Sequence, residues 1–130
     1  MDLALSLSRN SSADITNIRS IGSGTTGDTA LAISVYCSLK YEHDFSGGII
    51  AAVNHDGDSD STGAITGNLL GAYLGLDNIE NKWLDKLERR ELILEIADDL
   101  CYGVPTEDEP ERRARWTEKY VKMHAPEDMK

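Results

Sequence analysis

The sequence predicts an all-α protein, folded as a compact helical bundle. Apolar residues recur at spacings of three and four along most of the 130 residues, which is the period of an amphipathic helix. Glycine and, near the C-terminus, proline interrupt these stretches, and none of them shows the alternation expected of a strand. Because 40% of the residues are hydrophobic and only 6% are aromatic, the chain can bury a core, and that core should be aliphatic.

The first three helices should lie before residue 42. A short one is expected from Leu3 to Leu7, and a second from Asp14 to Ser20, where Gly22 stops it. Asp28 can cap a third helix that runs to about Tyr41. Four apolar residues share one face of this helix: Leu31, Ala32, Val35 and Leu39.

The next two helices should flank an acidic loop. Asp44 can cap the first of them, and its inward-facing residues should be Phe45, Ile49, Ala52 and Val53. The second should run from about Ser61 to Leu74, and glycine occupies every fourth position, at Gly63, Gly67, Gly71 and Gly75. Because each glycine lowers helix stability by about 1 kcal/mol relative to alanine, the stripe predicts a helix face pressed against another helix backbone.

The remaining residues should form two more helices and a charged tail. We expect a short helix from Asn78 to Leu87 and a longer one from Glu88 to Tyr102, ended by Gly103 and Pro105. The tail should add a peripheral helix packed on the same domain, with an apolar stripe of Trp116, Tyr120 and Met123, and residues from Ala125 should fray. These expectations divide the chain into a body, residues 1–103, and a tail, residues 104–130.

The net charge of −10 argues against nucleic acid or an anionic membrane as a partner. No Lys or Arg occurs between residues 41 and 81, a segment that is rich in Asp and Glu and should attract cations. The two cysteines, Cys37 and Cys101, lie in apolar helical patterns, so we expect buried thiols in a cytoplasmic protein instead of disulfides. No signal peptide or membrane-spanning apolar run is recognisable in the sequence.

A run of alternating aspartates is the most informative part of the sequence. Asp56, Asp58 and Asp60 alternate with small residues, and Ser61 follows directly. Carboxylates held so closely repel one another, and a divalent cation such as Mg²⁺ or Ca²⁺ is the usual partner of an all-oxygen cluster. A solvated acidic turn is the alternative. The run does not match an EF-hand loop, because its sixth and twelfth positions would be Ser61 and Gly67 instead of glycine and glutamate.

Gly22 to Gly27 fits the Gly-x-Gly-x-x-Gly pattern of dinucleotide-binding loops. Such a loop follows a strand, whereas the residues before Gly22 have helical spacing. We interpret it as a connection between helices whose backbone N–H groups could still hold a phosphate. His55 is interpreted as a packed supporting residue instead of a ligand. Since no Ser-His-Asp or Cys-His arrangement is discernible, no catalytic residue is assigned.

From Ala52 to Gly71 the chain resembles the ADP-ribosylglycohydrolase family, also called ADP-ribosyl-acceptor hydrolases. The late signature of that family is Gly-Asp-Ser/Thr-Asp-Ser/Thr followed by a helix of small residues, and Gly57 to Ser61 matches it. Ile18 to Gly24 and Ala30 to Cys37 are similar to the glycine loop and helix that precede the signature. The resemblance covers most of residues 1–103.

The resemblance implies an all-α fold with a two-Mg²⁺ centre in a cleft, in which Mn²⁺ is an alternative metal. Family members hydrolyse the glycosidic bond between ADP-ribose and a protein side chain such as arginine. By motif position Asp58, Asp60 and Ser61 would be metal ligands, and the loop that contains Gly22, Gly24 and Thr25 would border ADP-ribose. The implied partner is therefore ADP-ribose or an ADP-ribosylated protein.

The chain also departs from the family pattern. A Gly-Asp-rich start and a Thr-Asp-Asp segment, which supply the other metal ligands, are absent. The chain therefore looks like the C-terminal portion of the family's fold with part of the active site, and we expect it to need a separate N-terminal half or to self-associate. Thr25, Thr26 and Asp28 stand where the family often has an aromatic residue and a glutamate. Two other functions stay open: a non-catalytic module that binds ADP-ribose or metal, and a helical interaction protein.

Overall fold

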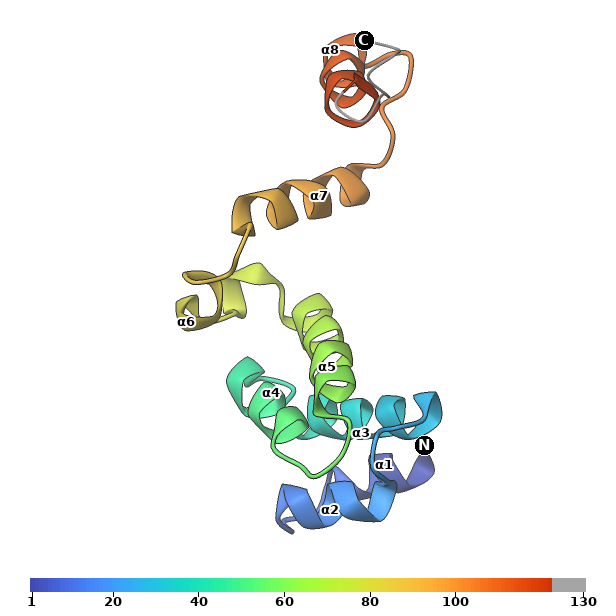
Figure 1. Cartoon of the computed structure of the whole chain (residues 1–130), viewed down its shortest axis with the longest axis vertical. Helices are drawn as coiled ribbons and strands as arrows, with labels where there is room; N and C mark the ends of the chain where they lie inside the picture. The colour runs from blue at the N-terminus through green and yellow to red at the C-terminus, as the bar shows by residue number, and fades with distance from the viewer. Residues whose placement is uncertain (123–130) are drawn as a thin grey trace. The chain divides into compact units, whose positions relative to one another are not determined.

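The computed structural model describes residues 1–122, and every regular element in that range is a helix (Figure 1). No strand occurs within these residues, which confirms the predicted all-α class. The chain divides into two units, Met1–Lys86 and Leu87–Lys130, and the expected boundary between residues 103 and 104 stays a prediction. The elements are α1 (Asp2–Leu7), α2 (Asp14–Ile21), α3 (Gly27–Lys40), α4 (Phe45–Val53), α5 (Ser59–Leu74), a 3₁₀ turn η1 (Leu76–Asn78), α6 (Asn81–Leu84), α7 (Arg90–Tyr102), α8 (Pro110–Trp116) and a π-helical segment η2 (Thr117–Lys122).

Helix α3 is the centre of the first unit, and α1, α2, α4 and α5 all pack against it (Figure 1). Its fully buried side chains include Ile33, Tyr36 and Cys37. Of the four residues on the predicted apolar face only Ala32 is buried, whereas Leu31 and Leu39 are 41% and 42% exposed. The helix is apolar around most of its circumference, so spacing alone does not identify its buried side.

The start of α3 corrects one predicted cap. The helix follows Thr26, which forms a capping box with Thr29, so Asp28 lies in the first helical turn. The Asp28 carboxylate accepts a hydrogen bond from the Thr26 hydroxyl. This bond, followed by one from the Thr29 backbone, lowers the pKa of Asp28. The predicted cap of α4 is confirmed, because Asp44 accepts a hydrogen bond from the Gly47 N–H at 2.9 Å.

Helix α5 packs on both α3 and α4 (Figure 1). Its buried residues form one stripe of Thr62, Thr66 and Leu70. The Thr62 hydroxyl donates to the carbonyl of Ala52 at 2.7 Å, so this threonine links α5 to the end of α4. Threonine at a helix contact carries no strong signal in the sequence, and the stripe was not predicted.

The glycine stripe of α5 does not face a helix backbone, which corrects the prediction. A Cβ added at Gly63 would approach a side-chain methyl group of Val53, and one added at Gly67 would lie 3.5 Å from Ile49 Cδ1. A Cβ added at Gly71 would meet nothing within 4 Å, and Gly75 lies beyond the helix as its C-cap. The tight contacts between α4 and α5 bring Gly63 against Val53 and Gly48 against Leu70, and both of these partners are side chains.

Four further expectations differ from the structure. Helix α5 begins at Ser59, two residues earlier than expected, and of the helix predicted over residues 78–87 only the short α6 (Asn81–Leu84) is formed, with η1 ending at Asn78. Val53 is exposed, although it was predicted to face inward. Cys37 is buried and burial raises its pKa to about 12, but Cys101 is exposed. Each of these positions lies at a helix end or on a helix with apolar residues on several sides.

In the second unit α7 ends at Gly103, as predicted, and this glycine has a φ of +69°. Pro110 occupies the first turn of α8. Within this unit Asp99 accepts hydrogen bonds from Lys119 and from the Tyr120 hydroxyl, and the rings of Trp116 and Tyr120 lie 4.6 Å apart. Met123, predicted to extend the apolar stripe, and the segment from Ala125 lie outside the described residues. None of the helices within residues 1–122 has the length and apolarity needed to cross a membrane.

Candidate functional site

Two loops of the first unit meet at the predicted site. One is the glycine loop, residues 22–26 between α2 and α3, and the other is the acidic loop, residues 54–58 between α4 and α5. The Asp58 N–H donates to the Ser23 carbonyl at 2.8 Å. A Cβ added at Gly57 would lie 1.8 Å from that same carbonyl oxygen, so only glycine fits there. The structure therefore brings together two motifs that lie about thirty residues apart in the sequence.

Gly24, in the glycine loop, is also packed closely against the acidic loop and α5. Its φ is +77°, and an added Cβ would lie 3.0 Å from Thr62 Cγ2 and 3.4 Å from the Asp58 carbonyl oxygen. Gly24 is therefore adjacent to the start of α5, where the predicted metal ligands lie. Gly22 borders a pocket of about 250 Å³ that is lined also by Arg19, Ser23 and His55. Thr25 is not among the residues that line this pocket; its hydroxyl lies 2.9 Å from that of Ser23.

The three predicted metal ligands lie at the N-terminus of α5. Asp58 is the N-cap residue, and Asp60 and Ser61 belong to the first helical turn. Asp58 does not cap the helix with its side chain. Asp60 Oδ1 accepts a hydrogen bond from the Ser61 N–H at 2.9 Å. The positive end of the helix dipole favours carboxylates at both positions.

The Asp58 and Asp60 carboxyl groups are close enough to influence each other's protonation. A hydrogen bond with Asp58 is the main cause that lowers the pKa of Asp60, and the Ser61 backbone N–H adds to it. Without a shared proton the two carboxylates would repel each other. Because carboxylate and hydroxyl oxygens are the ligands that Mg²⁺ prefers, the donor set fits a hard divalent cation.

Asp56, the first aspartate of the run, lies apart from this pair. Its carboxylate forms an ion pair with the guanidinium of Arg19 on α2, and both side chains are largely exposed. The sequence suggested three aspartates with a shared function, but the structure pairs Asp56 with helix α2 instead. Within residues 1–122, no group of three or more His, Cys, Asp or Glu side chains could enclose a metal ion. The described residues therefore offer two carboxylates and a hydroxyl, which is part of a coordination sphere.

His55 supports the acidic loop through two hydrogen bonds, in agreement with its interpretation as a packed supporting residue. Its Nδ1 accepts a hydrogen bond from the Gly57 N–H at 3.1 Å, and its Nε2 lies 2.9 Å from the Thr62 hydroxyl. Neither nitrogen is left over for a metal ion. The imidazole thus links the middle of the acidic loop to the first turns of α5.

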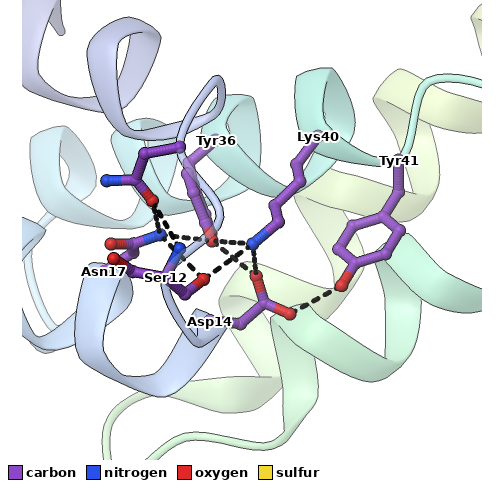
Figure 2. A network of polar contacts seen from close by, with 7 residues as sticks. Ser12, Asp14, Asn17, Tyr36, Lys40 and Tyr41 are labelled. Carbon is purple, nitrogen blue, oxygen red and sulfur yellow. Dashed lines mark hydrogen bonds and ion pairs between the residues drawn. The ribbon is translucent and has the colours of Figure 1, made fainter.

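A polar network fixes α2, and with it the beginning of the glycine loop, against α3 (Figure 2). Asp14 is its centre: the carboxylate accepts hydrogen bonds from the hydroxyls of Tyr36 and Tyr41, and Lys40 Nζ lies 2.8 Å away. Asn17 donates to the Tyr36 hydroxyl at 3.0 Å. The sequence did not reveal this network, because the partners of Asp14 lie 22 to 27 residues away from it.

The pKa values of this network reflect its hydrogen bonds. Burial disfavours the charged form of Asp14, but hydrogen bonds from Lys40, Tyr36 and Tyr41 outweigh it and lower the pKa of the carboxyl group. For Lys40, burial is likewise outweighed by the contact with Asp14, and its pKa rises to about 12. The hydrogen bond to Asp14 raises the pKa of Tyr41 to about 12. Asp14 is therefore a paired anion, and Lys40 a paired cation.

Comparison with known proteins places this geometry in a family. The sequence profile described as ADP-ribosylglycohydrolase matches residues 2–110. ADP-ribosylarginine hydrolase Tri1 of Serratia proteamaculans (strain 568) is 44% identical over 64 residues, which are 49% of this chain and 18% of that protein. ADP-ribosyl-dinitrogen reductase glycohydrolase of Rhodospirillum rubrum is 46% identical over 46 residues, which are 35% of this chain and 16% of that protein. The chain thus spans less than a fifth of these two relatives, and no solved structure is significantly similar to it.

Proposed function

The chain belongs to the ADP-ribosylglycohydrolase family, and from this membership we propose that it contributes part of a Mg²⁺-dependent site for hydrolysing ADP-ribose from a protein side chain such as arginine. The observation that carries the proposal is the contact between the glycine loop and the acidic loop. The matched relatives support the substrate class, since the name of one refers to ADP-ribosylarginine and that of the other to an ADP-ribosylated reductase.

Each loop has a distinct role in this proposal. Asp58, Asp60 and Ser61 hold Mg²⁺, or Mn²⁺ in its place, through two carboxylates and a hydroxyl. The bound metal would polarise ribose hydroxyls and orient a water molecule near the anomeric carbon. The glycine loop borders ADP-ribose, and Gly24 allows its backbone to lie against the start of α5. No residue of the chain is assigned as a general acid or base.

We propose that the remaining ligands come from a separate N-terminal half of the family's domain. Asp58, Asp60 and Ser61 would supply only part of the oxygen ligands of a two-metal centre, and the other acidic motifs of the family are absent from the sequence. In addition, an apolar groove of about 230 Å³ between α3 and α5 is lined by Val35, Leu39, Leu69 and Tyr73. We propose that the N-terminal half also covers this groove. The alternative is that two copies of the chain associate through it.

Release of ADP-ribose from ADP-ribosyl-arginine tests the proposal. The chain alone should show no measurable release, and addition of the N-terminal half of one of the matched relatives should restore Mg²⁺-dependent release. Asp58→Ala and Asp60→Ala should abolish that activity, and Asp56→Ala is the matched control because Asp56 pairs with Arg19. Removal of Asp58 loses no helix cap, so its variant should stay folded. Turnover that does not depend on Asp58 or Asp60 would refute the ligand assignment.

A non-catalytic module that binds ADP-ribose or metal is the second candidate. The incomplete set of acidic ligands within residues 1–122 favours it. Calorimetry with ADP-ribose distinguishes the two: binding without release, even when the N-terminal half is present, would identify such a module. We also propose a cytoplasmic location, supported by the two cysteines, both of which are free thiols.

A further inference from the structure

His55 is held by two hydrogen bonds that determine its tautomer. The Gly57 N–H can only donate, so Nδ1, 3.1 Å away, must be the unprotonated acceptor. The neutral imidazole then carries its proton on Nε2, which faces the Thr62 hydroxyl at 2.9 Å.

The surroundings of Thr62 are compatible with this tautomer. Its hydroxyl has one proton, and the oxygens within reach are the carbonyls of Ala52 at 2.7 Å, Asp58 at 3.1 Å and Ser59 at 3.3 Å. With Nε2 protonated, the hydroxyl proton goes to one of these three carbonyl oxygens, which only accept. The Thr62 oxygen is then free to accept from the Nε2–H of His55. A continuous chain of hydrogen bonds therefore runs from the Gly57 N–H through His55 and Thr62 to a carbonyl oxygen.

We infer that His55 is the positioning residue of the acidic loop. Gly57, to which it is bonded, is the residue that touches the Ser23 carbonyl, and the next residue is Asp58. Thr62, its other partner, lies one turn after Asp58 on the first turns of α5. The imidazole thus spans both sides of Asp58 and fixes where its carboxylate lies relative to Asp60. This inference rests on the proposed function in that it concerns the metal site of the same loop.

The matched variants are His55→Leu and His55→Asn in the full chain. Leucine keeps the bulk of the side chain and removes both hydrogen bonds. Asparagine keeps an acceptor oxygen near the position of Nδ1, and so keeps the partner of Gly57. His43→Leu is the control, because the His43 side chain is 77% exposed. The readouts are Mn²⁺-induced broadening of the backbone amides of residues 57–61, hydrogen exchange of the Gly57 and Asp58 amides, and thermal unfolding.

We expect His55→Leu to weaken Mn²⁺ binding by about 10–100-fold, the usual effect of losing a group that orients a metal ligand. It should also expose the Gly57 and Asp58 amides to exchange. His55→Asn should retain most of the Mn²⁺ affinity and most of the amide protection, and His43→Leu should change neither quantity. A folded His55→Leu variant with the parent's Mn²⁺ affinity and amide protection would overturn the inference, whatever its melting temperature.

Two further outcomes are decisive. If His55→Leu does not fold, the ¹⁵N shifts of the parent's imidazole decide: an Nε2–H tautomer with an unprotonated Nδ1 supports the inference, and an Nδ1–H tautomer overturns it. If the parent chain binds no Mn²⁺, the metal assignment itself fails. Amide protection that is lost in His55→Leu and kept in His55→Asn would then still show that His55 holds the loop.

Discussion

Gly57 is the residue at which the two loops leave no space for a side chain. A Cβ would lie 1.8 Å from a backbone oxygen of Ser23, and backbone cannot rotate away as a side chain can. We expect Gly57→Ala to separate the loops and to lower the free energy of unfolding by at least about 1–3 kcal/mol, as overpacking does. Urea unfolding measures this change. Gly27→Ala is the control, because nothing lies within 4 Å of a Cβ there, and equal stabilities of the two variants would contradict the loop contact.

Asp14 and its partners give the stability of the first unit a defined pH dependence. The pKa of Asp14 is lowered from 3.8, so its contribution is present above that pH and is lost as the pH falls through the folded-state value. The pKa values of Lys40 and Tyr41 are raised from 10.5 and 10.0 to about 12, so their contribution is present below pH 10 and is lost as the pH rises toward 12. Stability should therefore fall on both sides of a plateau.

Asp14→Asn provides the test of this pH dependence. Asparagine cannot form an ion pair with the Lys40 ammonium, so the variant should be less stable than the parent on the plateau. Its stability should also fall less than that of the parent at low pH and at high pH. Denaturant unfolding between pH 3 and pH 12, compared with the parent, measures the difference. Parallel curves for parent and variant would mean that other groups cause the pH dependence.

At the scale of elements, the α4–α5 contact separates two kinds of glycine. A Cβ at Gly71 would meet open space and one at Gly67 an ordinary contact at 3.5 Å, so alanine at either position should stabilise α5 by about 0.5–1 kcal/mol. A Cβ at Gly48 would lie 2.3 Å from Leu70 Cδ1, so Gly48→Ala should destabilise the protein. The melting temperatures of the three variants show which alanine stabilises the protein and which destabilises it. A lower melting temperature for Gly67→Ala would restore the original interpretation of a tightly packed glycine face.

Local signals predicted the helices better than their packing. Asp44 and Gly103 mark helix ends through their own chemistry, and both were correctly placed. Asp28 and Thr26 are both good caps, and only the capping box with Thr29 decides between them. The buried side of α3 and the threonine stripe of α5 depend on which helices come to lie beside them, and that information is not local.

The candidate site shows the same division between local and long-range information. The aspartate run and the glycine loop are recognisable as motifs, and their packing against each other agrees with a common site. The pairing of Asp56 with Arg19, and of Asp14 with Lys40 and Tyr41, joins residues that lie 26 to 37 positions apart. No spacing rule connects such residues before the helices are assembled.

At the scale of the whole molecule, the first unit leaves an apolar groove uncovered. Leu39 and Tyr73 line it and are 42% and 64% exposed. Ser38 of α3 also lines it, and its buried hydroxyl has no hydrogen-bond partner within residues 1–122. Apolar surface gathered in one groove is typical of an interface. The stretch without Lys or Arg, residues 41–81, contributes Glu42 to the rim of the groove, which disfavours a second acidic copy and favours a partner with basic residues.

Leu39→Lys tests this interface against a matched control. Leu5 on α1 is also 42% exposed but does not line the groove, so Leu5→Lys changes the same residue type at the same exposure elsewhere. We expect Leu39→Lys to weaken binding of a separately expressed N-terminal half by at least about tenfold, which corresponds to about 1.4 kcal/mol. Leu5→Lys should leave that affinity unchanged, and both variants should unfold at similar temperatures. Calorimetric titration measures the affinities, and light scattering of the chain alone reports self-association. If Leu39→Lys abolishes a dimer of the chain without affecting the N-terminal half, the groove is the site of self-association and the metal site must be completed from another surface.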